Sequence, residues 1–160
     1  MTRLYGWGNG GERVVDTTPG GHWNTTTMLA AIRCGGVIPE ACASFAGATD
    51  GEVFLFYIQE MLAPTLSCGD IVVMDNLSSH KVKGVREAIE ARGAEVWYLP
   101  PYSPDLNPIE MMWSKVKHLV RKAKARCEET LHKAIGKALR AVTEQELANY
   151  FEDCGYAGSE

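Results

Sequence analysis

The sequence lacks the features of secreted and membrane proteins. No apolar run approaches the roughly 20 residues needed to cross a bilayer, and the opening MTRLYGWGNGGERVV contains no apolar signal-peptide core. Cysteine is sparse, odd in number and widely spaced, with no CxxC pair, which argues against a disulfide framework and a structural zinc site. We therefore expect a protein of the reducing cytoplasm, without membrane contact, whose cysteines are buried free thiols. They are Cys34, Cys42, Cys68, Cys127 and Cys154.

Repeats, low-complexity segments and linkers are also absent. The 160 residues suit a single domain. An apolar content of 46% with 22% charged residues is typical of a globular protein with a core, and it excludes a disordered charged tail.

Charge is weakly negative overall but unevenly distributed. The formal net charge of −4 alone argues weakly against nucleic-acid binding, yet residues 115–126 contain six basic residues and no acid. A dense basic stripe on a mildly acidic protein indicates a surface for a polyanion. A solvated helix face is the alternative explanation. The six residues are Lys115, Lys117, Arg121, Lys122, Lys124 and Arg126.

The middle of the chain predicts a strand–helix–strand unit. Residues 71–74, IVVM, form a continuous apolar run, as expected for a strand that is buried on both faces. A helical pattern follows over 81–92, with Gly93 as its C-cap, and 95–99 is the next strand. Such a unit is a right-handed parallel crossover.

The first part of the chain predicts short extended segments and one helix. Residues 12–15, 25–32 and 37–45 are the expected extended segments. Thr49 and Glu52 have the spacing of a capping box, and Pro64 ends the helix that follows. Its inward face is predicted from helical spacing to contain Val53, Phe56, Tyr57 and Glu60.

A proline-rich loop introduces the C-terminal helices. The loop PPYSPDLNP is stiff, Asn107 is a suitable N-cap, and Pro108 fits the first helical position. The predicted helix runs to about residue 125, and two more follow near 129–142 and 144–153. Thr143 and Glu146 form the capping box of the last one. The apolar face of the first is Ile109, Met112, Trp113, Val116 and Val120.

Two acidic residues lie where rigid elements meet a predicted cleft. Asp75 ends the strand 71–74, and ligands in α/β sheets gather at such carboxyl ends. Glu110 lies in the first turn of a helix whose entry is fixed by prolines, with 34 residues between it and Asp75. Carboxylates on rigid mounts bind Mg²⁺, and paired ions of this kind cut phosphodiester bonds. Each residue also has a structural explanation. Asp75 fits a strand-to-turn cap, and Glu110 fits a capping box with Asn107. His80, five residues after Asp75, is more often a local hydrogen-bonding residue than a ligand.

Helical geometry predicts a basic track beside Glu110. At about 100° per residue, Glu110, Lys117, Arg121 and Lys124 fall within about 60° of each other. A DNA backbone along this track would be held by phosphate contacts, which position DNA without reading its sequence. We predict Lys115, Lys117, Arg121, Lys122 and Lys124 as DNA-binding residues.

These segments together resemble a known family. VVMDNLSSHK, followed by YLPPYSPDLNPIEMMWSKVK, resembles the DDE transposases of the mariner superfamily, bacterial insertion-sequence 630 branch. RLYGWGNGGERV and GHWNTTTMLAAI are also similar to that branch. The resemblance implies an α/β, ribonuclease H-like mixed sheet flanked by helices, and Mg²⁺- or Mn²⁺-dependent DNA cleavage and strand transfer in the bacterial cytoplasm. It also implies Asp75 and Glu110 as the second and third catalytic, metal-binding acids.

The chain departs from the family at its start. The family's first acid lies on the central first strand, upstream of the segment resembling RLYGWG, and nothing here matches that strand. Neither Asp16 nor Asp50 lies at the matching place. We therefore expect residues 1–160 to be a partial catalytic domain without the N-terminal helix-turn-helix region. Strand neighbours with open edges predict poor stability.

Three functions remain open from the sequence. The first is a truncated transposase with little activity alone, whose partners are transposon ends, target DNA and, as a homodimer or a mixed assembly, other transposase chains. The second is a non-catalytic remnant that binds DNA or pairs with an intact transposase. The third is a small metal-dependent nuclease of the same fold, which would not require the PPYSPDLNPIE segment.

Overall fold

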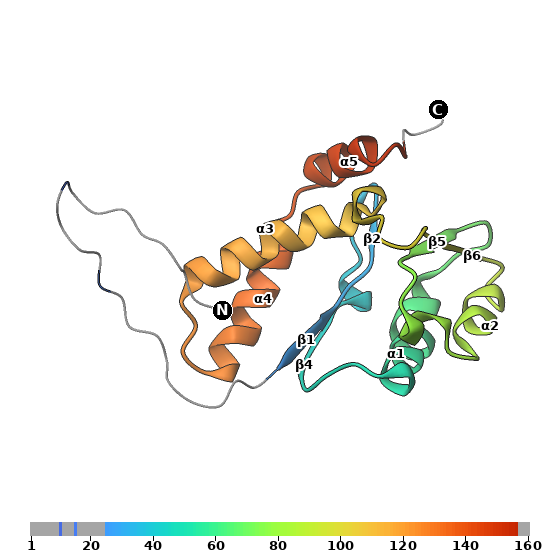
Figure 1. Ribbon diagram of the computed structural model, residues 1–160, viewed down its shortest axis with the longest axis horizontal. Helices are drawn as coiled ribbons and strands as arrows, with labels where there is room; N and C mark the ends of the chain where they lie inside the picture. The colour runs from blue at the N-terminus through green and yellow to red at the C-terminus, as the bar shows by residue number, and fades with distance from the viewer. Residues whose placement is uncertain (1–9, 11–14, 16–24, 157–160) are drawn as a thin grey trace.

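The computed structural model describes residues 10, 15 and 25–156, so most of the predicted strand 12–15 lies outside the described residues. Figure 1 shows strands β1, β2 and β4 beside the long helix α3, with β5, β6, α1 and α2 grouped apart from them. The strands are β1 Thr26–Leu29, β2 Ile32–Arg33, β3 Gly36–Val37, β4 Ala43–Ala46, β5 Ile71–Met74 and β6 Glu95–Tyr98. The α-helices are α1 Gly51–Tyr57, α2 Val85–Glu90, α3 Pro108–Ala123, α4 Glu128–Arg140 and α5 Glu144–Asp153.

Strand pairing in the described part of the chain gives three two-stranded sheets. β1 pairs with β4 and β2 pairs with β3, both antiparallel, while β5 pairs with β6 in parallel. The predicted parallel crossover over 71–99 is therefore confirmed. The expected single mixed sheet is not continuous among the described residues, because β1 and β5 are not hydrogen-bonded to one another.

The prediction that β5 is buried on both faces is wrong. Met74 is buried, but Ile71 is 48% exposed, and Trp97 on the neighbouring strand β6 is 53% exposed. Alternate side chains of a strand point to opposite faces. One face of the β5–β6 pair therefore packs into a core, while the other retains exposed apolar side chains.

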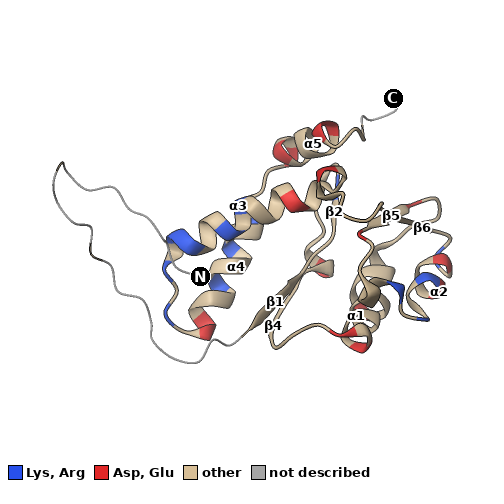
Figure 2. Ribbon diagram, in the orientation of Figure 1, with Lys and Arg blue, Asp and Glu red and all other residues tan. Residues whose placement is uncertain are grey.

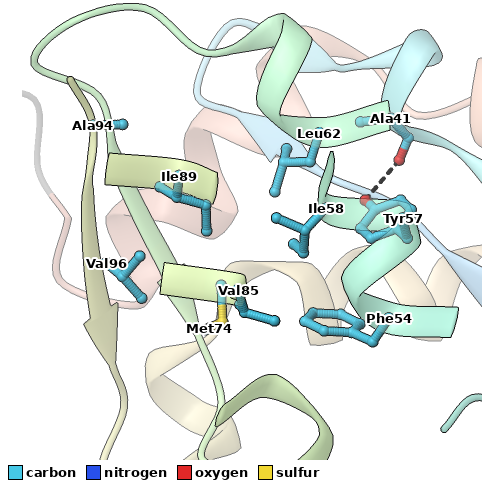
Figure 3. Packing of buried hydrophobic residues seen from close by; sticks show 10 residues of the cluster. All are labelled: Ala41, Phe54, Tyr57, Ile58, Leu62, Met74, Val85, Ile89, Ala94 and Val96. Atoms are coloured by element: carbon cyan, nitrogen blue, oxygen red, sulfur yellow. Dashed lines mark hydrogen bonds between the residues drawn. The ribbon is translucent and has the colours of Figure 1, made fainter. Parts of the chain in front are cut away.

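The first hydrophobic core lies between α1, α2 and the β5–β6 pair. Figure 3 shows Phe54, Tyr57, Ile58 and Leu62 directed toward Met74, Val85 and Val96. The Tyr57 hydroxyl donates a hydrogen bond of 2.8 Å to the Ala41 carbonyl oxygen, and burial raises the pKa of Tyr57 above its usual value. The ten buried residues of this core are Ala41, Phe54, Tyr57, Ile58, Leu62, Met74, Val85, Ile89, Ala94 and Val96.

The predicted start and inward face of α1 need correction. Asp50, not Thr49, caps the helix, because its Oδ1 accepts a hydrogen bond of 2.9 Å from the Val53 amide. Phe56 is 63% exposed and Glu60 is exposed, so the inward face begins instead at Phe54. The predicted inward positions and the buried ones, which include Phe54 and Ile58, both have helical spacing. Only packing against β5 and α2 distinguishes the two sets. The helix continues as a π-turn over Ile58–Leu62 and then as a 3₁₀ turn over Ala63–Thr65. Helical structure therefore ends one residue after Pro64, close to the predicted end.

The helix α2 is shorter than its sequence pattern predicts. Residues Ser78–Lys81 form a 3₁₀ turn, and α2 begins only at Val85. Gly84 explains the break, because its φ of 101° lies in the left-handed region that favours glycine. The C-cap is Ala91 and not Gly93 as predicted; Gly93, with a φ of 74°, lies two residues beyond it in the turn that follows the helix.

The second hydrophobic core joins α3, α4 and α5 to the first strands. Its buried residues are Met112, Val116, Val120, Ile135, Ala138 and Leu147, and Met28, Ile32 and Val37 pack against them. The predicted apolar face of α3 is confirmed, because Ile109 and Trp113 also contact this core. The predicted capping box of α5 is confirmed as well: the Glu146 amide donates to Thr143 Oγ1 and the Thr143 amide donates to Glu146 Oε2.

Lys115 connects α3 to α5. Its ammonium donates to both Glu146 carboxylate oxygens at 2.5 Å and to the Ala141 carbonyl oxygen at 2.7 Å. These contacts, led by the one to Lys115, lower the pKa of Glu146 to about 2. Lys115 thus links α3 to α5 by an ion pair at the polar edge of the second hydrophobic core.

Replacement of Lys115 by Met is expected to flatten the acid dependence of stability. Because the folded-state pKa of Glu146 is depressed, its contribution is present above the unfolded pKa near 4.5 and is lost as pH falls toward 2. Urea unfolding of both proteins between these pH values measures the effect. Asp70, whose pKa of about 2 is set mainly by Arg33, titrates in both proteins and serves as an internal control. Parallel pH profiles for the two proteins would refute the assignment.

All five cysteines are free, as predicted, but their predicted burial is wrong for most of them. Cys154 is buried, Cys42 is half-buried, and Cys34, Cys68 and Cys127 are exposed. The exposed three lie in turns or at the N-terminus of α4, where no core covers the side chain. Among the described residues, no helix is long and apolar enough to cross a membrane.

Candidate active site

Asp75 follows the last residue of β5, as predicted. Its Oδ1 accepts a hydrogen bond of 3.2 Å from the Leu77 amide, so the strand-to-turn cap considered from the sequence is present. The same Oδ1 lies 2.6 Å from His80 Nδ1. Both contacts fall on one carboxylate oxygen, and within the described chain Oδ2 has no hydrogen-bond partner. Asp75 therefore caps the turn and still has an oxygen free for a ligand.

Glu110 lies in the first turn of α3. Its amide donates a hydrogen bond of 3.0 Å to the Asn107 carbonyl oxygen, but the Asn107 side chain makes no capping bond. The Asn107 amide bonds to Pro104 instead of the Glu110 carboxylate, so the capping-box alternative is not observed. Glu110 is exposed, and its carboxylate is available to bind a ligand.

The loop before α3 is fixed at both ends. Pro104–Leu106 form a 3₁₀ turn, and Pro108 occupies the start of α3. The hydroxyl of Tyr156, beyond α5, donates a hydrogen bond of 2.9 Å to the Leu106 carbonyl oxygen. The stiffness predicted from the prolines is thus reinforced by a contact from the C-terminal end of the chain.

One cavity of about 270 Å³ brings the two acids together. Its wall contains Asp75, His80, Asn107 and Glu110, although Asp75 and Glu110 come from opposite ends of the 34-residue interval. The rest of the wall is mostly apolar and comes from β1, β2, β5 and α1. The cavity therefore lies between the two strand systems that are not hydrogen-bonded to each other.

The donor chemistry of this cavity fits a hard divalent cation. Mg²⁺ is commonly held by one or two carboxylates together with waters and substrate phosphates, and Asp75 and Glu110 supply two carboxylates. No group of three or more His, Cys, Asp or Glu residues that could hold a metal ion occurs in the described part of the chain. Asp70 also lines the cavity, but Arg33 engages both of its carboxylate oxygens. An ion held by Asp75 and Glu110 would therefore need oxygen ligands from elsewhere.

The basic residues concentrate on α3 and α4. Figure 2 shows Lys and Arg along the C-terminal half of α3 and on α4. Glu110 lies in the first turn of α3, at the other end of the helix. Residues 108–140 contain nine of the sixteen Lys and Arg residues but only three of the twenty acids. Lys117 and Arg121 fall on one side of the helix, in line with Glu110, and Lys124 is the C-cap that follows the helix.

Lys115 differs from the other residues predicted to bind DNA. Its ammonium is engaged by Glu146 and Ala141, and its side chain is 26% exposed. Arg121, Lys122 and Lys124 are exposed and Lys117 is partly exposed. The prediction of phosphate contacts is therefore retained for these four residues.

His80 was predicted to be a local hydrogen-bonding residue, and its polar contact with Asp75 is local. The structure adds that the His80 side chain lines the cavity, which the sequence did not predict. The available signal was its position five residues after an acid at a strand end. Phe54, which stacks on the His80 ring with centroids 4.1 Å apart, carried no such signal because its partner is 26 residues away.

Solved structures of Mos1 transposase share this fold at low identity. The Mos1 strand transfer complex is 17% identical with a TM-score of 0.74, and the match covers 97% of this chain and 47% of that one. The Mos1 mariner paired end complex with Mn is 18% identical with a TM-score of 0.72, covering 98% and 48%. The catalytic domain of Mos1 mariner transposase is 16% identical with a TM-score of 0.66, covering 84% and 76%.

These matches identify the fold as that of a ribonuclease H-like catalytic domain, as predicted. The chain spans about half the length of the Mos1 chains in the two complexes. No curated protein sequence matches it. A family model described as DDE superfamily endonuclease matches residues 1–132. Because this match covers most of the chain, the protein belongs to the DDE superfamily endonucleases.

Proposed function

We propose that this chain is the catalytic portion of a transposase that cuts and joins DNA with the help of Mg²⁺ or Mn²⁺. The observation that carries the proposal is the shared cavity, where Asp75 and Glu110 meet beside the loop before α3. The PPYSPDLNPIE loop further favours the insertion-sequence 630 branch of the mariner superfamily. The same proposal places the protein in the bacterial cytoplasm, on nucleoid DNA.

The side chains of the cavity have separate tasks in this reaction. Asp75, on rigid β5, and Glu110, at the fixed start of α3, would hold the metal. A bound divalent cation activates the attacking water or 3′-hydroxyl and stabilises the leaving oxygen. The new oxygen–phosphorus bond would form as the ester bond to the leaving nucleotide breaks; the proton of the nucleophile would pass to solvent, and the leaving oxygen would take up a proton from solvent. Lys117, Arg121 and Lys124 would hold the DNA backbone beside this site.

We further propose that the site is incomplete without a third carboxylate. Asp75 and Glu110 suffice for one ion with phosphate ligands, and Asp70 on the same wall is paired with Arg33, but a pair of ions needs more oxygen donors. β1 and β5 both line the cavity without being hydrogen-bonded to each other, and we propose that a strand bearing that acid pairs between them. Activity of the 160-residue chain alone is therefore proposed to be very low.

DNA and other transposase chains are the proposed partners. Mos1 structures include paired-end and strand transfer complexes, and Mos1 catalytic domains with Mg and with Mn. By this likeness, transposon ends and target DNA are the substrates proposed here. We also propose that the chain assembles as a homodimer or with a full-length transposase.

A plasmid-nicking assay tests the catalytic part of the proposal. The chain is expected to nick supercoiled DNA very slowly in Mg²⁺ or Mn²⁺, and Asp75→Asn or Glu110→Gln should remove whatever nicking remains. Rapid metal-dependent nicking that Asp75→Asn abolishes would support a transposase site but contradict its incompleteness. Nicking that persists unchanged in both variants would contradict the assignment of the two acids.

A second candidate function is DNA or transposase binding without catalysis. The concentration of basic residues on α3 and α4 favours it, because that surface does not depend on the third carboxylate. It predicts that Asp75→Asn leaves DNA affinity unchanged in the absence of metal. The two functions share the same DNA surface and differ only in whether the cavity performs chemistry.

A further inference from the structure

We propose that His80 is a positioning residue that fixes the carboxylate of Asp75 for metal binding. This inference rests on the proposed function, since it concerns the same cavity. It assigns to the turn after β5 a role beyond connecting β5 to α2: the turn presents a side chain that sets the orientation of Asp75.

The contact between the two side chains is close and partly shielded. His80 Nδ1 lies 2.6 Å from Asp75 Oδ1, and the side chains are 17% and 42% exposed, respectively. His80 Nδ1 is buried, and its contact with Asp75 does not have the geometry of a hydrogen bond. The pair is therefore a close polar contact. The Leu77 amide also donates a hydrogen bond to Oδ1. The contacts from His80 and Leu77 therefore fix Oδ1 as the oxygen of Asp75 that faces the protein.

Two further contacts fix His80 itself. Its ring stacks on Phe54 with a centroid distance of 4.1 Å and an interplanar angle of 28°. Phe54 is 6% exposed and belongs to the first hydrophobic core, so the stacking surface cannot easily move. The Tyr98 hydroxyl donates a hydrogen bond of 3.0 Å to the His80 carbonyl oxygen, which ties the turn to the end of β6.

The two oxygens of the Asp75 carboxylate therefore have different surroundings. Oδ1 is held by the turn and by His80, and Oδ2 remains for an external cation. A site that binds metal or substrate needs its side chains locked by surrounding contacts, because small displacements are costly. Outer contacts of this kind typically change metal affinity by about 10–100-fold when they are removed.

Mn²⁺ binding to substituted proteins tests the proposal with a readout that is independent of catalysis. His80→Phe keeps a ring to stack on Phe54 but removes the nitrogen, and we expect it to raise the Mn²⁺ dissociation constant about 10–100-fold. His80→Asn places an amide nitrogen near the position of Nδ1 and should restore affinity to within a few-fold. His118→Phe, at an exposed position on α3, is the matched control and should leave the affinity unchanged. Titration followed by electron paramagnetic resonance gives each constant, and thermal unfolding gives the stability of each variant.

The outcomes separate this proposal from the proposed function. If Asp75→Asn weakens Mn²⁺ binding but His80→Phe does not, the metal site stands and the positioning role of His80 is refuted. If neither substitution weakens binding, or the unsubstituted protein binds no Mn²⁺, the metal site itself fails. A loss in His80→Phe that His80→Asn does not restore, or that follows a loss of stability, would indicate a structural role and overturn the proposal.

Discussion

Substitution of the basic track, Lys117→Glu, Arg121→Glu and Lys124→Gln together, is expected to reduce affinity for duplex DNA about 100-fold. If each phosphate interaction contributes about 1 kcal/mol, removing three of them costs about 3 kcal/mol, and every 1.4 kcal/mol is about tenfold. The salt dependence should change as well, because each phosphate interaction that is removed lowers the log–log slope by about 0.9. Fluorescence anisotropy over about 50–200 mM salt measures both quantities. Gln is chosen at Lys124 because a new negative charge at the C-terminus of α3 would oppose the helix dipole.

A matched control separates the track from net charge. Lys83→Glu with Arg92→Glu changes the total charge by nearly as much, at exposed positions around α2 in the other half of the molecule. This control is expected to retain most of the affinity and the full salt slope. Equal losses in both variants would mean that overall charge, and not the α3 surface, governs DNA binding.

Local sequence signals predicted most of the secondary structure correctly. The crossover over 71–99, the stop at Pro64, the N-terminal Pro108 and the Thr143–Glu146 capping box follow from backbone chemistry that neighbouring residues determine. These elements needed no knowledge of distant contacts.

Predictions that depended on tertiary packing were less successful. The inward face of α1 was misplaced because two sets of positions fit helical spacing, and packing against β5 selects the set that includes Phe54. Burial of β5 on both faces was overestimated because an apolar run does not reveal that one face, at Ile71 and Trp97, stays open. Burial of the cysteines was assumed from residue type, whereas three of them lie in turns or at a helix terminus.

The candidate site was predictable in its residues but not in its contacts. Asp75 and Glu110 were identified from their positions at the ends of rigid elements, and both line one cavity. The engagement of Lys115 by Glu146 and the stacking of Phe54 on His80 join segments that sequence spacing does not connect with each other. Side-chain contacts of this kind become visible only when the chain is folded.

We propose that Asp75 and Glu110 form one divalent metal site. The two residues come from different elements and share only the cavity wall, so a common effect on metal binding would be hard to explain otherwise. Removing a charged oxygen ligand is expected to weaken binding more than any change in the surrounding contacts.

The most direct measurement is Mn²⁺ affinity for the unsubstituted protein, Asp75→Asn, Glu110→Gln and the double variant. We predict that the protein binds Mn²⁺ and that each single substitution weakens binding by more than about tenfold. The double variant should bind Mn²⁺ most weakly of the three, because it retains neither carboxylate ligand. Glu60→Gln, at an exposed position outside the cavity, is the control and should bind as the unsubstituted protein does. Unchanged affinity in Asp75→Asn and Glu110→Gln would contradict the account.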